Sequence, residues 1–262
     1  MTPPVASPIY ARYARNMSDD DEISPGGSRV YRHEARDRDW EAPPSDGAME
    51  AIEAHFHQYF GEVSSVFHEL VSDLVHLDVH IVPPTDERPW YTLFTTGMSD
   101  RPMTVPEGCE ELRYAELLIA LPPDWRLDLL GVSPPPPDLE RWYWPIRWLK
   151  QLARLPHEYG TWLGFGHSIP NGDPAEPFHP STKLAGWVLL PPISVPEEGS
   201  EIVLPDRSIH LYTLHALHPE EMSLKLNKGT EALLDAFEAH AVDEMLRIDR
   251  PPVTTDWLYP VD

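Results

Sequence analysis

The sequence predicts an α+β fold in which a mixed, largely antiparallel central sheet is packed by helices. Short segments bounded by proline alternate apolar and polar residues, as half-buried strands do, and longer segments repeat apolar residues at helical spacing. Apolar residues make up 41% of the 262 residues and nine are tryptophan, so the chain can fill one sizeable core. With no internal repeat and no second clear boundary, we expect one domain.

The two ends of the chain differ from its middle in composition. Residues 1–47 contain charged, turn-forming stretches such as "MSDDDEISPGG" without a sustained apolar period. We expect a flexible, charged and proline-rich extension there, or local packing on the body. Residues 48–250 form the predicted domain, and residues 251–262 are predicted to be a C-terminal tail.

The first half of the domain predicts one helix followed by three strands. In "GAMEAIEAHFHQYFG" the apolar residues Ile52, Phe56 and Tyr59 share one helical face before Gly61 ends the pattern. "LVHLDVHIVPP", "WYTLFTTG" and "LRYAELLIALPPDW" then read as strands, and prolines close the first and the last. Three strands in this order suggest an antiparallel meander.

The second half predicts two helices and two further strands. Apolar residues recur near period 3.6 over residues 139–152, which predicts an amphipathic helix. "AGWVLLPP" and "IHLYTLHALHPEEM" read as strands. The stretch "NKGTEALLDAFEAHAVDEML" predicts a closing helix with Leu233, Phe237 and Ala241 on its inner face.

The charge of the chain restricts its partners. Twenty basic and 43 acidic residues give a net charge of −23, and the acidic residues are spread over the whole chain. Such a surface disfavours nucleic acid and anionic membranes as partners and favours a basic protein. One cysteine excludes an intramolecular disulfide, and neither a membrane-spanning run nor a signal peptide is evident, so we expect a cytoplasmic protein.

"HLDVH" is the sequence feature that most resembles a metal site. In a strand, His76, Asp78 and His80 would lie on one face, and two imidazoles with a carboxylate suit iron or zinc in a metal-dependent hydrolase. The outer two would, however, stand about 13 Å apart, because a strand rises about 3.3 Å per residue. A polar strand face without metal is therefore the favoured interpretation, and no cofactor or metal is predicted.

No nucleophile signature is present in the sequence. The G-x-S-x-G pattern is absent, and Cys109 lies among Glu107, Glu110 and Glu111, which would raise its pKa and weaken it as a nucleophile. The sequence therefore predicts no catalytic residue and no enzyme.

Several motifs resemble the suppressor-of-fused (SUFU) domain family in its bacterial, single-domain form. They are "VFHELVSDLVHLDVHIVPPTDERPWYTLFTTGMSDRPMTVP", "RYAELLIALPPDW", "WPIRWLKQLARLPHEYGTWLGFGHSIP", "GWVLLPP" and "LYTLHALHPEEMSLKLNKGTEALLDAF". "TTGMSDRPM" and "YAELLIALPPDW" are the most specific. The resemblance covers roughly residues 48–250.

The resemblance implies a mixed sheet and a protein-binding function. In the animal relative a second domain helps to clamp an extended peptide, and we expect no such domain in this chain. Bacterial relatives imply an immunity protein, which would neutralise a toxin, most simply a basic one, by binding it. A regulatory scaffold that binds a peptide by strand addition is the alternative within the same class.

Polar residues at strand ends are the predicted partner-binding surface, because loops on a rigid sheet are recruited for recognition. Met98 and Met103 are expected to pack the turn between them onto the body. Glu116 interrupts an apolar strand, so a buried, paired carboxylate is the alternative interpretation for it. The predicted surface residues are Asp100, Arg101, Glu107, Glu110, Glu111 and Glu116.

Overall fold

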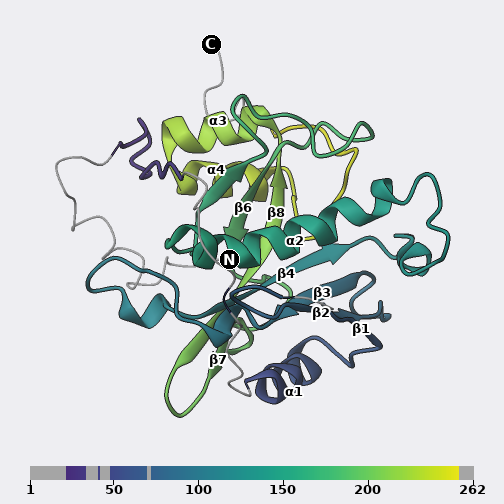
Figure 1. Ribbon diagram of the computed structural model, residues 1–262. Helices are drawn as coiled ribbons and strands as arrows, with labels where there is room; N and C mark the ends of the chain where they lie inside the picture. Colours follow the sequence, from purple (N-terminus) through teal and green to yellow (C-terminus); the bar gives the residue numbers. More distant parts are fainter. Residues whose placement is uncertain (1–21, 34–40, 42–47, 70–71, 254–262) are drawn as a thin grey trace.

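The computed structural model describes residues 22–33, 41, 48–69 and 72–253, and Figure 1 shows a central sheet covered by helices. The helices are α1 (Met49–Tyr59), α2 (Glu140–Tyr159), α3 (Pro219–Lys228) and α4 (Thr230–Ala239). The strands are β1 (Ser65–Phe67), β2 (Asp78–Val82), β3 (Tyr91–Thr96), β4 (Ala115–Leu121), β5 (Ser168–Pro170), β6 (Gly186–Leu190), β7 (Glu201–Val203) and β8 (Ser208–Leu217). Short 3-10 turns are η2 (Met98–Asp100), η3 (Glu110–Leu112), η4 (Leu127–Leu129) and η5 (Glu197–Ser200).

The strands form one mixed sheet in the order β1-β2-β3-β4-β8-β6-β5, and β7 also pairs with β8. The meander β2-β3-β4 is antiparallel, as predicted. The pairing of β4 with β8 is parallel and is the exception in an otherwise antiparallel sheet. The predicted α+β fold class is therefore confirmed.

Strand β8 joins the two halves of the sheet. Its first residues pair with β4 on one side and β7 on the other, and its last residues, Thr213–Leu217, pair with β6. Figure 1 shows β6 and β8 standing upright across the direction of β2, β3 and β4. Beyond the point where β4 and β8 separate, a later segment occupies the space, and the backbone N–H of Leu246 donates to the carbonyl oxygen of Ala120 at 2.8 Å.

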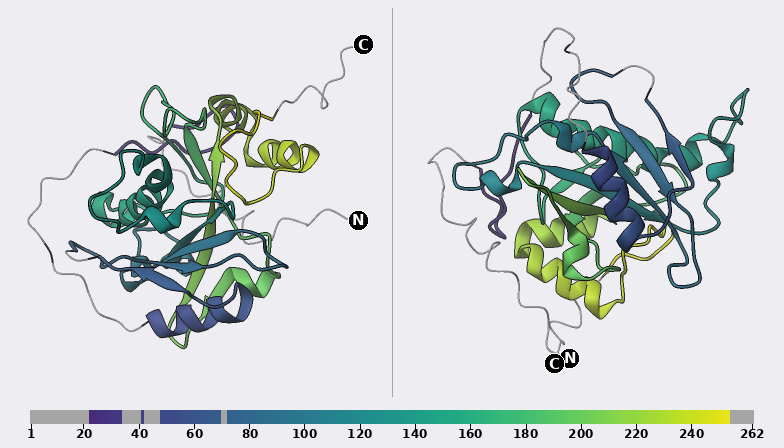
Figure 2. Two further views of the ribbon diagram at one scale, coloured as in Figure 1. Left: turned by 90° about the vertical axis from the view of Figure 1, so that its right-hand side faces the viewer. Right: turned by 90° about the horizontal axis from the view of Figure 1, so that it is seen from below.

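Helices cover both faces of this bent sheet (Figure 2). One face packs on α2 around the fully buried Trp144 and Trp187. On the opposite face, α1 packs on β2–β4 and β8 through Phe56 and Phe94, whose rings stack at 3.5 Å between centroids. Helices α3 and α4 cover β6 and the end of β8 on that same opposite face, where Phe237 is buried. The strand ends between these layers carry the candidate functional residues.

Two predicted elements need correction. The strand expected over "LVHLDVHIVPP" begins only at Asp78, because the residues before it bend through Leu74, which has a positive φ of 68°. The helix expected over "NKGTEALLDAFEAHAVDEML" is shorter than predicted, because α4 begins only after Gly229, at φ 93°, and ends at Ala239, while Asn227 and Lys228 belong to the end of α3. Ala241 lies beyond α4 at φ 51°, so it is not on the helix face with Leu233.

The N-terminal extension is only partly described. Residues 22–33 and Glu41 contact the body, while 1–21, 34–40 and 42–47 lie outside the described residues, as do residues 254–262 of the predicted tail. The division into an extension, a domain and a tail stays a prediction.

Candidate functional site

Strand β3 ends in the tight turn η2, where the sequence reads Gly-Met-Ser-Asp. Gly97 has φ 100°, and a Cβ atom there would lie 1.8 Å from the carbonyl oxygen of His76. Conformation and space both therefore require glycine. Met98 and Met103 are buried, which confirms that they pack this turn onto the body.

The carboxyl group of Glu116 lies behind the turn. Its side chain is 0% exposed at the start of β4. One oxygen accepts hydrogen bonds from the Ser99 backbone N–H at 2.9 Å and the Ser99 hydroxyl at 2.7 Å, and the other accepts the Thr95 hydroxyl at 2.6 Å. Burial raises the pKa of Glu116 to about 7, and the bonds from Thr95 and Ser99 limit the rise.

Glu116 must therefore be removed from the predicted binding surface. It is the buried carboxylate that the sequence offered as the alternative, and it ties the end of β3 to β4. Thr95 assists, because its hydroxyl oxygen also accepts the backbone N–H of Leu117 at 3.0 Å, where the two strands have stopped pairing. Ser99, completely buried, is likewise structural.

Asp100, the last residue of the turn, and Arg101, directly after it, lie at the surface, and both are half-buried. Arg101 forms an ion pair with Glu41 of the N-terminal extension, a partner that the sequence did not predict. His157 of α2 holds the turn from below, with its Nε2 3.0 Å from the carbonyl oxygen of Met98. Burial lowers the pKa of His157 to about 4, so its imidazole is neutral at pH 7 and donates this bond from Nε2–H.

Glu107, Glu110 and Glu111 are exposed on the segment around η3, as the sequence predicted. Cys109 and Leu112 on the same segment are buried and anchor it to the body. Burial, and secondarily the charges of Glu111 and Glu110, raise the pKa of the Cys109 thiol in the predicted direction. The segment thus displays three carboxylates on a fixed backbone.

Two further contacts fix this acidic segment. The ring of His210, in β8, lies 3.0 Å from the carbonyl oxygen of Glu111. The backbone N–H of Gly108 donates to Glu110 at 3.3 Å, and hydrogen bonds from backbone N–H groups lower the pKa of Glu110. The sheet therefore holds the backbone of the segment at Glu111, and a backbone N–H of the loop itself orients the carboxylate of Glu110.

His76, Asp78 and His80 do not form one site. His76 precedes β2, and its Nε2 lies 3.3 Å from Asp78, which also contacts Nδ1 of His68 at 3.0 Å. His80 is buried separately, with Nε2 2.9 Å from the Thr96 hydroxyl. Among the described residues no group of three His, Cys, Asp or Glu side chains is arranged to hold a metal ion. The three residues on which the hydrolase alternative depends are thus not brought together as ligands of one metal ion.

A second fully buried carboxylate, which the sequence did not single out, lies at the start of α3. Glu221 accepts two hydrogen bonds from the Arg250 guanidinium, at 2.5 and 2.6 Å. It also accepts the backbone N–H groups of His218 at 2.8 Å and Val253 at 2.9 Å. The signal in the sequence was "HPEE", which predicts only an ordinary helix start.

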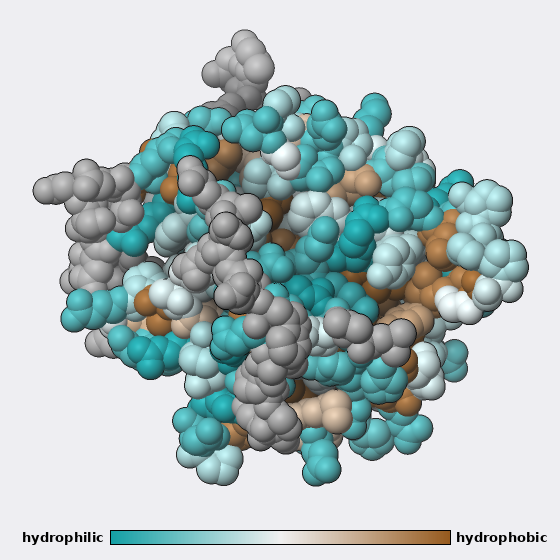
Figure 3. Space-filling view, viewed as in Figure 1, coloured by the Kyte–Doolittle hydropathy of each residue, from teal (hydrophilic) through white to brown (hydrophobic). Residues whose placement is uncertain are grey.

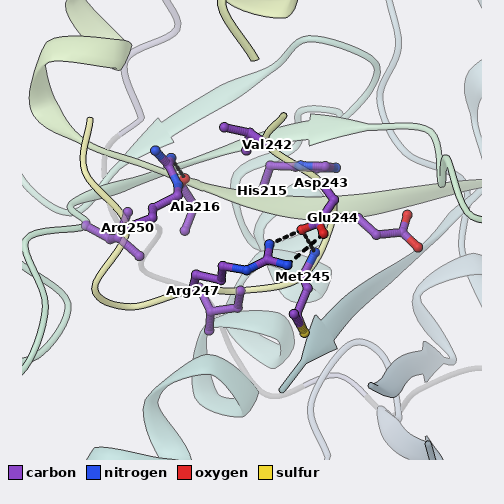
Figure 4. Close-up of a pocket in the computed structure, with 10 residues that line it drawn as sticks. His215, Ala216, Val242, Asp243, Glu244, Met245, Arg247 and Arg250 are labelled. Carbon is purple, nitrogen blue, oxygen red and sulfur yellow. Dashed lines mark hydrogen bonds and ion pairs between the residues drawn. The ribbon is translucent and has the colours of Figure 1, made fainter. Parts of the chain in front are cut away.

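Figure 4 shows a small hollow lined by Arg250 and lying between β8 and residues 242–250. Asp243 and Arg247 form an ion pair at its edge, and Arg250 donates to the carbonyl oxygen of Ala216 at 2.7 Å. His215 lines it, and burial lowers the pKa of this imidazole to about 4. The space holds about one water molecule, so it cannot take a substrate.

Fold and site together define a mixed α+β domain whose strand-end polar residues brace the chain and display carboxylates. In the described part of the chain they form no metal centre. The family model for Suppressor of fused protein (SUFU) matches residues 73–251, so the chain belongs to the suppressor of fused family. Its fold is a protein-binding one. No helix among the described residues is long and apolar enough to cross a membrane.

Solved structures of this family share the fold. A SUFU homologue from Neisseria gonorrhoeae is 14% identical with a TM-score of 0.54, over 79% of this chain and 94% of that one. The structure of the Sufu–Fu complex is 16% identical with a TM-score of 0.56, and the match covers 84% of this chain and 96% of that one. Drosophila Suppressor of Fused is 16% identical with a TM-score of 0.57, and the match spans 83% of this chain and 53% of the Drosophila protein. No curated protein matches the chain.

Proposed function

We propose that this chain is a non-enzymatic, cytoplasmic immunity protein that neutralises a basic toxin by binding it. The observation that carries the proposal is the anchored acidic segment with Glu107, Glu110 and Glu111, in a protein-binding fold with a net charge of −23. A carboxylate cluster on a rigid backbone loses little entropy on binding and steers a basic partner toward it.

The mechanism is occlusion. A toxin that acts on nucleic acid needs a positively charged active site, and an acidic surface that covers it competes with the phosphates of the substrate. Asp100, in the turn that follows β3, extends the acidic surface. The neighbouring positive charge of Arg101 is already paired with Glu41. No covalent chemistry is required of this chain.

We expect a basic protein to be encoded next to this gene, and the test is its association with this chain. Replacing Glu107, Glu110 and Glu111 together by lysine should slow association at least about tenfold and raise Kd, measured by surface plasmon resonance. Raising the salt concentration should slow association of the unaltered protein as well, because salt screens exposed charges.

The matched control replaces three exposed acidic residues of α4, Glu231, Asp235 and Glu238, by lysine. It changes net charge equally at another place. Equal loss of binding in both triple variants would show that only total charge matters. Unaltered binding in the first variant would contradict the proposed surface.

A further inference from the structure

Residues 22–33, which we call the strap, lie against the C-terminal end of α3 (Figures 1 and 2). The backbone N–H of Gly26 donates to the carbonyl oxygen of Leu226 at 2.7 Å. A Cβ atom at Gly26 would lie 2.4 Å from the backbone nitrogen of Gly229, so the two backbones touch there. Among the described residues, the strap contributes no side chain to the three hydrophobic clusters of the core.

Beneath the strap lies Lys225, a buried cation. It is 3% exposed, and its Nζ donates to the hydroxyl of Ser168 in β5 at 3.0 Å and approaches the Ser28 hydroxyl of the strap at 3.5 Å. In the described parts of the chain it has no ion pair with a carboxylate. Burial lowers the pKa of Lys225 to about 8. Burying a charge with only neutral acceptors is costly, and in a chain with 43 acidic residues it is unexpected.

The rest of the strap rests on an aromatic surface. The ring of Tyr31 lies 6.0 Å from that of His167, and the indole N–H of Trp162 is 3.4 Å from the Tyr31 hydroxyl. Trp162 and His167 pack edge to face at 4.3 Å. Tyr31 keeps 40% of its surface exposed, and its contacts with Trp162 and His167 are both long. His33 of the strap packs on Tyr159 of α2, with 5.4 Å between the ring centroids. Ring contacts and one long hydrogen bond therefore hold the strap to this surface, without an ion pair or a short side-chain hydrogen bond among the described residues.

We propose that the strap is a displaceable cover over a peptide-docking site, and that this site binds an external segment with a carboxylate for Lys225 and an aromatic side chain for Trp162 and His167. A carboxylate would give Lys225 the charge-assisted hydrogen bond that the distant Ser28 hydroxyl does not provide. The proposal goes beyond toxin neutralisation, because an acidic segment and a basic surface are different ligands.

The face seen in Figure 3 carries mostly hydrophilic side chains with scattered hydrophobic ones between them. Energetically, the strap acts as an intramolecular competitor. An external segment must bind better than the strap to displace it, and the unpaired cation supplies that margin.

Opening of the strap is tested in the full-length protein with Gly26→Ala. The added methyl group meets the Gly229 backbone, so the strap should lift. Acetylation of Lys225 by acetic anhydride, followed by mass spectrometry, should accelerate about tenfold or more, as should tryptic cleavage after Arg29. The exposed Lys183 is the internal reference and should react unchanged.

Ser28→Asp is the opposite variant and leaves the backbone contact intact. It supplies the missing carboxylate from the strap itself, so acetylation of Lys225 should become slower than in the unaltered protein. Unaltered rates in this variant would overturn the proposal. So would an unaltered rate in Gly26→Ala with a native circular dichroism spectrum.

Docking is tested with a dye-labelled synthetic peptide of residues 22–33 carrying Asp at position 28. It should bind the full-length Gly26→Ala protein saturably, and at least about tenfold more tightly than the same peptide with Ser28. Adding Lys225→Met, which keeps the aliphatic stem, should abolish that difference. Equal binding of the two peptides to Gly26→Ala, or no binding at all, would show that Lys225 is not an anchor.

Discussion

Glu116 and Glu221 are both fully buried, and the protein accommodates them in opposite ways. Glu116 has hydroxyl and backbone donors, and no cation pairs with it among the described residues. Glu221 has a two-point ion pair with Arg250 and two backbone donors. Neutral donors are thus sufficient to hold a buried carboxyl group whose pKa is near 7. A guanidinium partner additionally fixes a segment that is distant in the sequence.

The two sites also differ in what they connect. Glu116 joins a strand to the turn beside it and so fixes the base of the candidate surface. Glu221 lies in the first turn of α3, where the helix dipole stabilises its negative charge. It also binds Arg250 and Val253 and so fixes the segment that follows α4. Removing hydrogen bonds of Glu116 should therefore have a local, pH-dependent effect. Removing the ion pair of Glu221 should destabilise the whole domain.

The largest expected effect is that of Arg250→Met. Its removal leaves Glu221 buried without a counter-charge, which should lower the free energy of unfolding by about 3–5 kcal/mol. Urea denaturation followed by tryptophan fluorescence measures it. Arg247→Met is the control, because its partner Asp243 is 41% exposed, and its cost should stay below about 1 kcal/mol. Equal costs would remove the distinction between the buried and the exposed pair.

Glu116→Gln should change the pH dependence of stability. The folded-state pKa of Glu116 is raised from 4.5 to about 7, so the folded state binds the extra proton and stability is lost as pH rises through that window. The loss is on the order of 3 kcal/mol. The difference in unfolding free energy between variant and unaltered protein should therefore shift in favour of glutamine from pH 4.5 to pH 7.

The buried histidines change the free energy of unfolding with pH in the direction opposite to Glu116. Their contribution must therefore be subtracted from the pH profile. Burial lowers the pKa of His80, His157, His167 and His215 from 6.5 to about 4, so their contribution is present above pH 6.5 and lost as pH falls toward 4. Both proteins share these groups, so the difference between the two profiles isolates Glu116. A difference that stays flat from pH 4.5 to 7 would contradict the raised pKa.

The smallest expected effect is that of Ser99→Ala. It removes one of the three donors to Glu116 and should cost about 1 kcal/mol, measured by thermal unfolding at pH 8, where the carboxylate is charged. Because that donor favours the charged form, the pKa of Glu116 should rise further. Ser223→Ala, on the exposed face of α3, is the control and should stay within about 0.5 kcal/mol.

The elements of the fold were largely predictable because their periodicity is strong. The meander, α2 and the strand at Gly186–Leu190 follow from apolar spacing, and proline marks several ends. The parallel pairing of β4 with β8 was not predictable, because the local sequence pattern of a strand does not indicate which distant strand pairs with its free edge. The break at Gly229 was missed, because a single glycine inside a helical pattern does not by itself predict the end of a helix.

The candidate site was predictable in part for the same reason. Glu116 could be recognised as anomalous because it interrupts an apolar strand. Glu221 could not, because its partner Arg250 lies outside the helix and only tertiary structure brings them together. Arg101 was expected to be displayed, yet Glu41 pairs with it from a segment that has no apolar period of its own.

The sharing of β8 between the two halves of the sheet has a consequence for biosynthesis. All seven residues of β4 are buried, and its outer edge is completed only when residues 210–213 pair with residues 115–118. On the ribosome, β4 therefore emerges long before the strand that covers it. Until then the nascent chain exposes an apolar edge that invites pairing with other chains, so chaperone protection during this interval should determine the yield of folded protein.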